Sequence, residues 1–311
     1  MVRYFLASLD LFGGDIASQT HTVLSVGADE PPRDLLQEFP WIKQWSVDIR
    51  WVDRELFKQW EYDATGVDRF WVESNAEIVA MVDADLLVGA SLDSMVARVA
   101  ESERVHGFMA HISPFGYGNF RSTPSATWWN QIYAAAGMDA PDLDRQVSAW
   151  GLDQDFNPNI ALADPEHRMA PDYFNYGVII GPRRHFESMA VTYLDDIETV
   201  STVVPGSRYI SQIANCITFA RHQIPCDLLP INDNFPLNLP AEEMRRLNPD
   251  PYGQDSDEDI RIFHYIGRRK VFASPESVAE FVGRSDVSAV DRVFQERLRA
   301  TAIQTGELHA D

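Results

Sequence analysis

Residues 78–88 read IVAMVDADLLV, in which five apolar residues lead without a polar break into Asp83 and Asp85. An apolar run of this length is typical of a strand covered on both faces in a parallel sheet. We therefore expect the two carboxylates at the end of a central strand, where ligands bind in open α/β sheets. Because alternate residues of an extended chain point the same way, Asp83 and Asp85 can reach one point while Ala84 points elsewhere.

The two carboxylates suggest a cation site. Two hard oxygen ligands directed at one point suit Mn²⁺ or Mg²⁺, which keep other coordination positions for water and phosphate oxygens. The alternative is a surface turn with two solvated acids, because so short a motif often matches by chance. The apolar strand ahead of the acids favours the cation site over the turn.

The composition indicates a globular protein whose negative charge repels polyanions. The chain has 311 residues, 45% of them hydrophobic, which is enough for a large core. Asp and Glu number 47 against 26 Lys and Arg, a formal net charge of −21. We therefore expect no nucleic-acid partner. An anionic small molecule remains compatible where a cation or a local basic cluster neutralises it.

Cysteine content and hydropathy address the cellular compartment. Cys216 and Cys226 are too few for a disulfide framework and lack metal-ligand spacing, which indicates buried free thiols in a reducing compartment. The apolar stretch near the N-terminus is stopped by Asp10, and nowhere do about 18 apolar residues follow one another. We expect a cytoplasmic protein without a signal peptide or a transmembrane segment. The sequence leaves open whether it forms a homo-oligomer.

The order of the expected elements indicates an α/β fold. Strands are predicted at residues 4–9, 22–27, 47–51, 78–82, 105–112, 174–181, 226–229 and 260–266. Helices are predicted at residues 33–39, 70–76, 91–99, 128–137, 183–198, 209–222 and 286–300. The alternation through residue 112 favours a Rossmann-like, mostly parallel sheet flanked by helices. We divide the chain into an α/β domain, residues 1–275, and a C-terminal helical extension, residues 276–311.

Two later groups of residues complement the acidic pair. His264 ends an apolar run and offers an imidazole nitrogen, and Gly267 and three basic residues, Arg268, Arg269 and Lys270, follow it directly. Mn²⁺ accepts mixed carboxylate and imidazole ligation, and a bound diphosphate would complete its shell. Taken singly, His264 could instead be a histidine with a purely structural role. Residues 268–270 could instead form a basic patch exposed to solvent.

Three motifs in this order resemble one enzyme family. Residues 83–85 (DAD), 174–178 (FNYGV) and 264–270 (HYIGRRK) are similar to the D-x-D, F-N-x-G-V and H-x-x-G-x-x-K motifs of the glycogenin-like and galactosyltransferase-like enzymes of glycosyltransferase family eight. The resemblance spans roughly residues 2–272. It implies a GT-A fold and a hexosyltransferase that moves a sugar from a nucleotide-sugar donor, a UDP-sugar, to an acceptor hydroxyl with retention of configuration.

The same resemblance implies roles for individual residues. Asp83, Asp85 and His264 would bind Mn²⁺ (or Mg²⁺), with Asp85 counted among the catalytic residues through the metal. The residues that would contact the donor are Ala7, Ser8, Arg69, Asp83, Ala84, Asn175, Gly267 and Lys270. Ala7 and Ser8 would border the nucleotide, Arg69 and Asn175 the sugar, and Gly267 and Lys270 the diphosphate.

The chain departs from the family pattern in two places. Family members usually carry an Asp-Gln pair near the reacting sugar carbon, and this chain has Ser211-Gln212. The tryptophan usual after the lysine is replaced by Val271-Phe272. Gln212 therefore remains as the candidate that stabilises the developing oxocarbenium ion through its side-chain oxygen.

Two rival functions fit parts of the pattern. A strand followed by D-x-D also begins haloacid-dehalogenase-like phosphatases, with Asp83 as nucleophile and Asp85 as acid. That class needs a second acidic pair, for which Asp195-Asp196 is the candidate, and its motif normally opens the chain. The second rival is a relative that binds a nucleotide without transferring sugar, because fold alone does not establish function.

Overall fold

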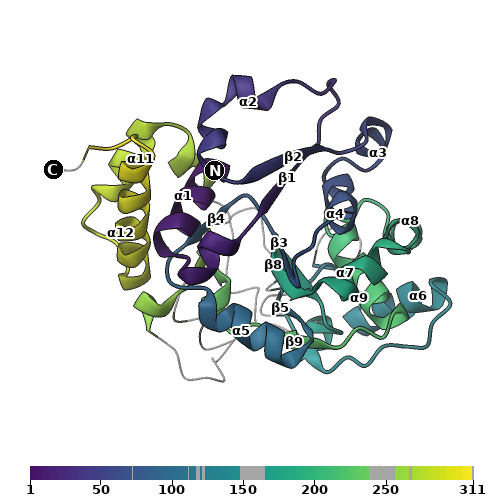
Figure 1. Cartoon of the computed structure of the whole chain (residues 1–311). Helices are drawn as coiled ribbons and strands as arrows, with labels where there is room; N and C mark the ends of the chain where they lie inside the picture. Colours follow the sequence, from purple (N-terminus) through teal and green to yellow (C-terminus); the bar gives the residue numbers. More distant parts are fainter. Residues whose placement is uncertain are drawn as a thin grey trace.

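The structure is a computed structural model that describes residues 1–71, 73–110, 112–116, 120, 123–147, 165–237, 242, 245, 256–265 and 268–309. Within these ranges it is an α/β protein whose strands form small mixed sheets surrounded by helices, as Figure 1 shows. The α/β fold class with mixed sheets flanked by helices is therefore confirmed.

The largest sheet has the strand order β3-β8-β5-β9. Its strands are β3 (Ile78–Val82), β8 (Phe174–Pro182), β5 (Val105–Met109) and β9 (Cys226–Leu228). β8 runs antiparallel to both β3 and β5, whereas β9 runs parallel to β5. One side of the sheet carries α4 (Tyr62–Phe70), α7 (Arg183–Ala190), α8 (Tyr193–Val203) and α9 (Ile210–Arg221) (Figure 1). The helix α5 (Asp93–Ser102) contacts β8 and β3, and its buried residues belong to a different apolar cluster from those of the other four helices.

A second sheet has the order β10-β11-β4 and lies beside the first. It consists of β10 (Phe235–Pro236), β11 (Ile262–His264) and β4 (Leu86–Val88). β11 is parallel to β10 and antiparallel to β4. Since β3 ends at Val82 and β4 begins at Leu86, the three residues of the D-x-D motif form a direct connection between the two sheets.

Three helices cover the second sheet. They are α1 (Val2–Phe12), α11 (Pro275–Val282) and α12 (Ala289–Gln304), which lie together in Figure 1. Tyr4 of α1, Leu87 of β4 and Phe294 of α12 belong to one buried apolar cluster. The C-terminal helices therefore share a core with the first helix of the chain. The proposed boundary at residue 275 remains a prediction.

The remaining elements are peripheral to the site. β1 (Thr22–Val26) and β2 (Val47–Trp51) form a parallel pair, and β6 (Arg145–Gln146) pairs antiparallel with β7 (Met169–Ala170). The other α-helices are α2 (Leu35–Glu38), α3 (Arg54–Trp60) and α6 (Ser125–Ala135). The 3₁₀ turns are Asp15–Gln19, Pro40–Gln44, Pro165–His167, Ile231–Asp233, Asp257–Asp259 and Arg269–Phe272.

Several predicted elements were wrong. Residues 4–9 are not a strand but part of the helix α1, because a short run that is apolar on every side fits a buried helix as well as a strand. Residues 70–76 are not a helix, since α4 ends at Phe70, and the helix expected at 183–198 is two helices, α7 and α8.

The strand at residues 78–82 exists but is not central. Among the described residues β3 pairs only with β8, and that pairing is antiparallel, so β3 is an edge strand. Met81 is its one fully buried residue. The apolar run predicted a strand buried on both faces of a sheet. In the structure, the strand pairs with β8 on one side and is only partly buried, so an apolar run of this length also fits an edge strand.

None of the helices in the described ranges combines the length and the apolar character needed to cross a bilayer.

The two thiols provide a test of this core. Cys216 and Cys226 are both buried and free, as predicted, and burial raises the pKa of each thiol well above its ordinary value. Because the thiolate is the nucleophile, we expect neither to react with iodoacetamide at about pH 8 in the folded protein. Both should react after unfolding in urea. Mass spectrometry counts the adducts, and rapid alkylation of the folded protein would contradict the burial.

Candidate functional site

The D-x-D motif is fixed to both sheets by backbone hydrogen bonds. The Asp83 N–H donates to the carbonyl oxygen of Gly177 in β8 over 3.2 Å. The Asp85 carbonyl oxygen accepts from the N–H of Tyr265, the residue after β11, over 3.1 Å. Each aspartate therefore takes its position from a different sheet.

His264 reaches the acidic pair through the pairing of β11 with β4. It is the last residue of β11 and stands opposite Leu86, the residue that follows Asp85. Its Nε2 lies 3.3 Å from Asp85 Oδ1 and 4.0 Å from Asp83 Oδ2. His264 and Asp85 are each 3% exposed, and Asp83 is half-buried. Residues far apart in the sequence thus meet at one point.

This group has the composition of a divalent-cation site. Asp83, Asp85 and His264 each offer one ligand atom, and these atoms lie within 4.8 Å of one another. Around a six-coordinate ion such as Mn²⁺, ligand atoms stand roughly 3 to 4.2 Å apart, so small side-chain movements would close the shell. Two carboxylate oxygens with one imidazole nitrogen fit Mn²⁺ and leave positions for other ligands.

Arg69 neutralises one of the two carboxylates. This residue of α4 donates from Nη2 to Asp83 Oδ1 over 3.1 Å, and its guanidinium lies 5.7 Å from the ring centre of Tyr176. The Nη1 of Arg69 is buried and has no hydrogen-bond partner among the described residues. Arg69 therefore orients Asp83 and has a further N–H donor beside the site. Its contact with the donor sugar, which the resemblance implies, remains a prediction.

Gly177 makes room for the imidazole. A Cβ at this position would lie 2.4 Å from His264 Nδ1 and 2.6 Å from His264 Cε1, distances that real contacts do not allow. Asn175 Oδ1 accepts from the Gly177 N–H over 2.7 Å. The β5 pairing skips from Ile179 to Phe174, so residues 175–178 bulge out of the ladder, as strands often do beside active sites. The F-N-x-G motif thus provides the space that the imidazole of His264 occupies.

Other residues predicted to bind the donor lie in different surroundings. Ala7 and Ser8 are on α1 with no exposed surface, and Ser8 Oγ accepts from the Val88 N–H over 2.9 Å. They support β4 from within the core and present no surface to a ligand. Ala84 is exposed, and its carbonyl oxygen accepts from the Tyr265 hydroxyl over 3.4 Å.

The basic segment after His264 is only partly described. Gly267 lies outside the described residues. Lys270 is exposed and lines a cavity of about 820 Å³, whose other walls come from α11 and the segment leading into α12. Arg268 lines the same cavity and forms an ion pair with Asp291. Contact of Gly267 and Lys270 with a diphosphate remains a prediction.

Gln212 lies near the start of α9 and is half-buried. Its neighbour Ser211 donates its N–H to Asp63 Oδ1 of α4 over 3.3 Å, and burial raises the pKa of that carboxyl. Because α4 also carries Arg69, one helix contacts both the acidic pair and the start of α9. Asp63 was not singled out from the sequence, and nothing in its local pattern would have identified it.

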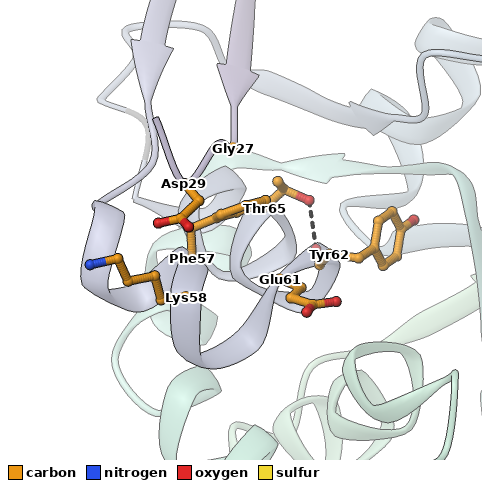
Figure 2. A pocket seen from close by; sticks show the side chains of 7 residues that line it. All are labelled: Gly27, Asp29, Phe57, Lys58, Glu61, Tyr62 and Thr65. Atoms are coloured by element: carbon orange, nitrogen blue, oxygen red, sulfur yellow. Dashed lines mark hydrogen bonds between the residues drawn. The ribbon is translucent and has the colours of Figure 1, made fainter. Parts of the chain in front are cut away.

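A pocket opens beside this helix. It has a volume of about 540 Å³ and is lined by Gly27, Asp29, Phe57, Lys58, Glu61, Tyr62 and Thr65, which Figure 2 shows. Gly27 directly follows β1, so the pocket lies at the carboxyl end of a parallel strand pair, a common place for ligands. Figure 2 also shows the hydrogen bond from Thr65 Oγ1 to the Tyr62 carbonyl oxygen, 2.7 Å long.

One solved structure shares this arrangement of elements. The galactosyltransferase LgtC, solved in complex with donor and acceptor sugar analogs, matches with a TM-score of 0.53 and 13% identity over 98% of this chain and 96% of that one. Mouse xyloside xylosyltransferase 1 matches with a TM-score of 0.43 and 10% identity, over 86% of this chain and 91% of that chain. No protein-family model and no curated protein matches the sequence. The first comparison supports the GT-A type of fold that the sequence predicted.

The role of Gly177 can be tested directly. Gly177→Ala should displace the imidazole of His264, because the added methyl group would overlap it. We expect the affinity for Mn²⁺, measured by titration calorimetry, to fall by about tenfold or more. In the control Gly283→Ala, the nearest atom is 3.3 Å from the new methyl group, and Mn²⁺ binding should not change. Equal Mn²⁺ affinity in Gly177→Ala and the wild type would show that Gly177 is not needed to place the imidazole of His264.

Proposed function

We propose that the chain is a glycosyltransferase that uses a divalent cation to move a sugar from a nucleoside-diphosphate sugar, a UDP-sugar, to an acceptor hydroxyl. The observation that carries this proposal is the meeting of Asp83, Asp85 and His264 at one point within a GT-A type fold. The LgtC structure was solved with donor and acceptor sugar analogs, and the proposal extends that kind of ligand to this chain.

The protein groups would work mainly on the leaving group. A bound Mn²⁺ or Mg²⁺ supplies positive charge to the departing nucleoside diphosphate, an effect of several kcal/mol. Asp83, Asp85 and His264 would hold the ion, and Arg69 keeps Asp83 turned toward it. The buried, unpartnered Nη1 of Arg69 would donate to an oxygen of the donor. These groups are fixed before substrate arrives, which makes their electrostatic effect efficient.

Gln212 is proposed as the group nearest the reacting carbon. Its side-chain oxygen would face the positive charge that develops on the sugar ring, and Asp63 holds the start of its helix through the Ser211 N–H. The missing aspartate of the family's Asp-Gln pair is replaced here by Ser211. Retention of configuration is proposed from the family resemblance and follows from no geometry described above.

The structure disfavours the phosphatase reading. That reading requires a second acidic pair at the D-x-D motif, and Asp195-Asp196 is the sequence candidate. Both residues lie on α8, where Asp196 is fully buried and forms an ion pair with Arg221 over 2.7 Å. Thr218 Oγ1 also donates to Asp196 over 2.8 Å. Asp196 is thus occupied in holding α8 against α9.

Asp85 carries the first test of the proposal. Asp85→Asn should lower Mn²⁺-dependent release of UDP from a UDP-sugar by about 100-fold or more, because one charged ligand is lost. Coupled detection of UDP gives the rate. Asp195→Asn, which removes an exposed carboxylate of α8, is the matched control and should retain full activity. Phosphate release from monoesters without UDP release would favour the phosphatase, and Mn²⁺-dependent UDP binding without turnover would favour a non-catalytic relative.

Gln212 carries the second test. Gln212→Ala should reduce kcat by about 100-fold, the usual cost of removing one preorganised dipole, while Mn²⁺ and UDP bind as before. Steady-state kinetics and calorimetry separate the two effects. Gln131→Ala removes an exposed glutamine of α6 and should leave both unchanged. Unaltered sugar transfer in Gln212→Ala would remove Gln212 from the mechanism.

A further inference from the structure

The imidazole of His264 has two faces with different neighbours. Nε2 is directed at the carboxylates, 3.3 Å from Asp85 Oδ1. Nδ1 is directed at Gly177, where an added Cβ would lie only 2.4 Å away. Because the side chain is 3% exposed, Nδ1 faces protein instead of bulk solvent. A histidine that ligates a cation through Nε2 carries its proton on Nδ1, and that N–H needs an acceptor.

Asn175 is the first amide group on the Nδ1 side. Its Oδ1 would lie 2.7 Å from a Cβ on Gly177, so it adjoins the same point as His264 Nδ1. This oxygen already accepts from the Gly177 N–H over 2.7 Å and from Asn234 Nδ2 over 3.5 Å. A carbonyl oxygen has two lone pairs, and both are therefore in use.

Asn234 is the second amide group and has acceptor capacity left. It directly precedes β10, in which Pro236 stands beside His264 in parallel register. Its Nδ2 donates to Asn175 Oδ1, the oxygen that adjoins the same point as His264 Nδ1, so the Asn234 amide lies on the Nδ1 side of the imidazole. Asn234 is 1% exposed, and its Oδ1 has no hydrogen-bond partner in the described part of the chain. Buried amide oxygens are rarely left in this state.

We propose that Asn234 is a positioning residue: its Oδ1, which has no partner among the described residues, turns to accept the His264 Nδ1–H and so keeps the proton on Nδ1, with Asn175 holding the Asn234 amide nearby. This leaves the lone pair of Nε2 directed at the point shared with Asp83 and Asp85. The inference rests on the proposed function, because it concerns the same cation site. Asn234 itself touches neither cation nor sugar, and it acts through His264. Such outer partners typically change metal affinity by about 10- to 100-fold.

Nitrogen-15 NMR of histidine-labelled protein at about pH 8 reads the tautomer without any metal. His264→Gln identifies the His264 signals among the eight histidines. The wild type should show Nδ1 protonated and Nε2 unprotonated. Asn234→Ala should give a mixture of the two tautomers and a Mn²⁺ affinity, measured by electron paramagnetic resonance, lowered by about tenfold or more. Asn234→Asp retains an acceptor and should preserve the wild-type tautomer.

Asn215→Ala is the matched control. Asn215 on α9 is also fully buried, and neither atom of its amide has a partner among the described residues. Its removal should leave the His264 tautomer and Mn²⁺ affinity unchanged. Thermal unfolding checks that each variant folds. If Asn234→Ala does not fold, Asn234→Leu replaces it, because leucine is close to asparagine in volume and also lacks the acceptor.

Two outcomes overturn the inference. One is a wild-type tautomer and wild-type Mn²⁺ affinity in a folded Asn234 variant that lacks the acceptor. The other is an equal effect of Asn215→Ala. The failure of the proposed function is distinguishable, since a wild type that binds Mn²⁺ and transfers no sugar leaves the tautomer comparison intact.

Discussion

The short antiparallel pairing of β4 with β11 is the contact on which the candidate site depends. It places His264 opposite the residue after Asp85 and thereby joins segments that lie far apart in the sequence. The ladder covers three residues on each strand, so it needs support from both sides. Ser8 of α1 bonds the Val88 N–H, and the ring of Phe294 packs against Phe263 at 5.4 Å between centres. The first and last helices of the chain thus hold the ladder.

The candidate site concentrates negative charge, and positive groups are needed to offset it. Two carboxylates face one another beside a histidine, and Arg69 forms an ion pair with Asp83. Asp85 lies 3.3 Å from the imidazole and is almost fully buried. Burying a carboxylate is costly unless a positive charge or hydrogen bonds compensate it. A divalent cation bound by Asp83, Asp85 and His264 would add positive charge to this group, which agrees with its proposed role.

The sequence predicted the grouping of the candidate ligand residues better than it predicted the secondary structure around them. Asp83, Asp85 and His264 were found because carboxylate and imidazole ligands at strand ends have a recognisable pattern, and the structure brings all three together. The helix at α1 was missed because Tyr4 to Leu9 is apolar on every side and has no period to distinguish helix from strand. Asn234 could not be found, since its importance comes from contact with Asn175, 59 positions away in the sequence, and no local pattern encodes that contact.

The D-x-D motif is also one of the covalent connections between two sheets that have separate hydrogen-bond ladders, and the segment from β9 to β10 is another. Asp83 is anchored to β8, whereas Asp85 and His264 belong to the β4–β11 side. An ion bound by all three side chains would therefore add a cross-link between the two sheets at this point. The proposed cation would have a structural effect on the junction of the sheets in addition to its role at the donor.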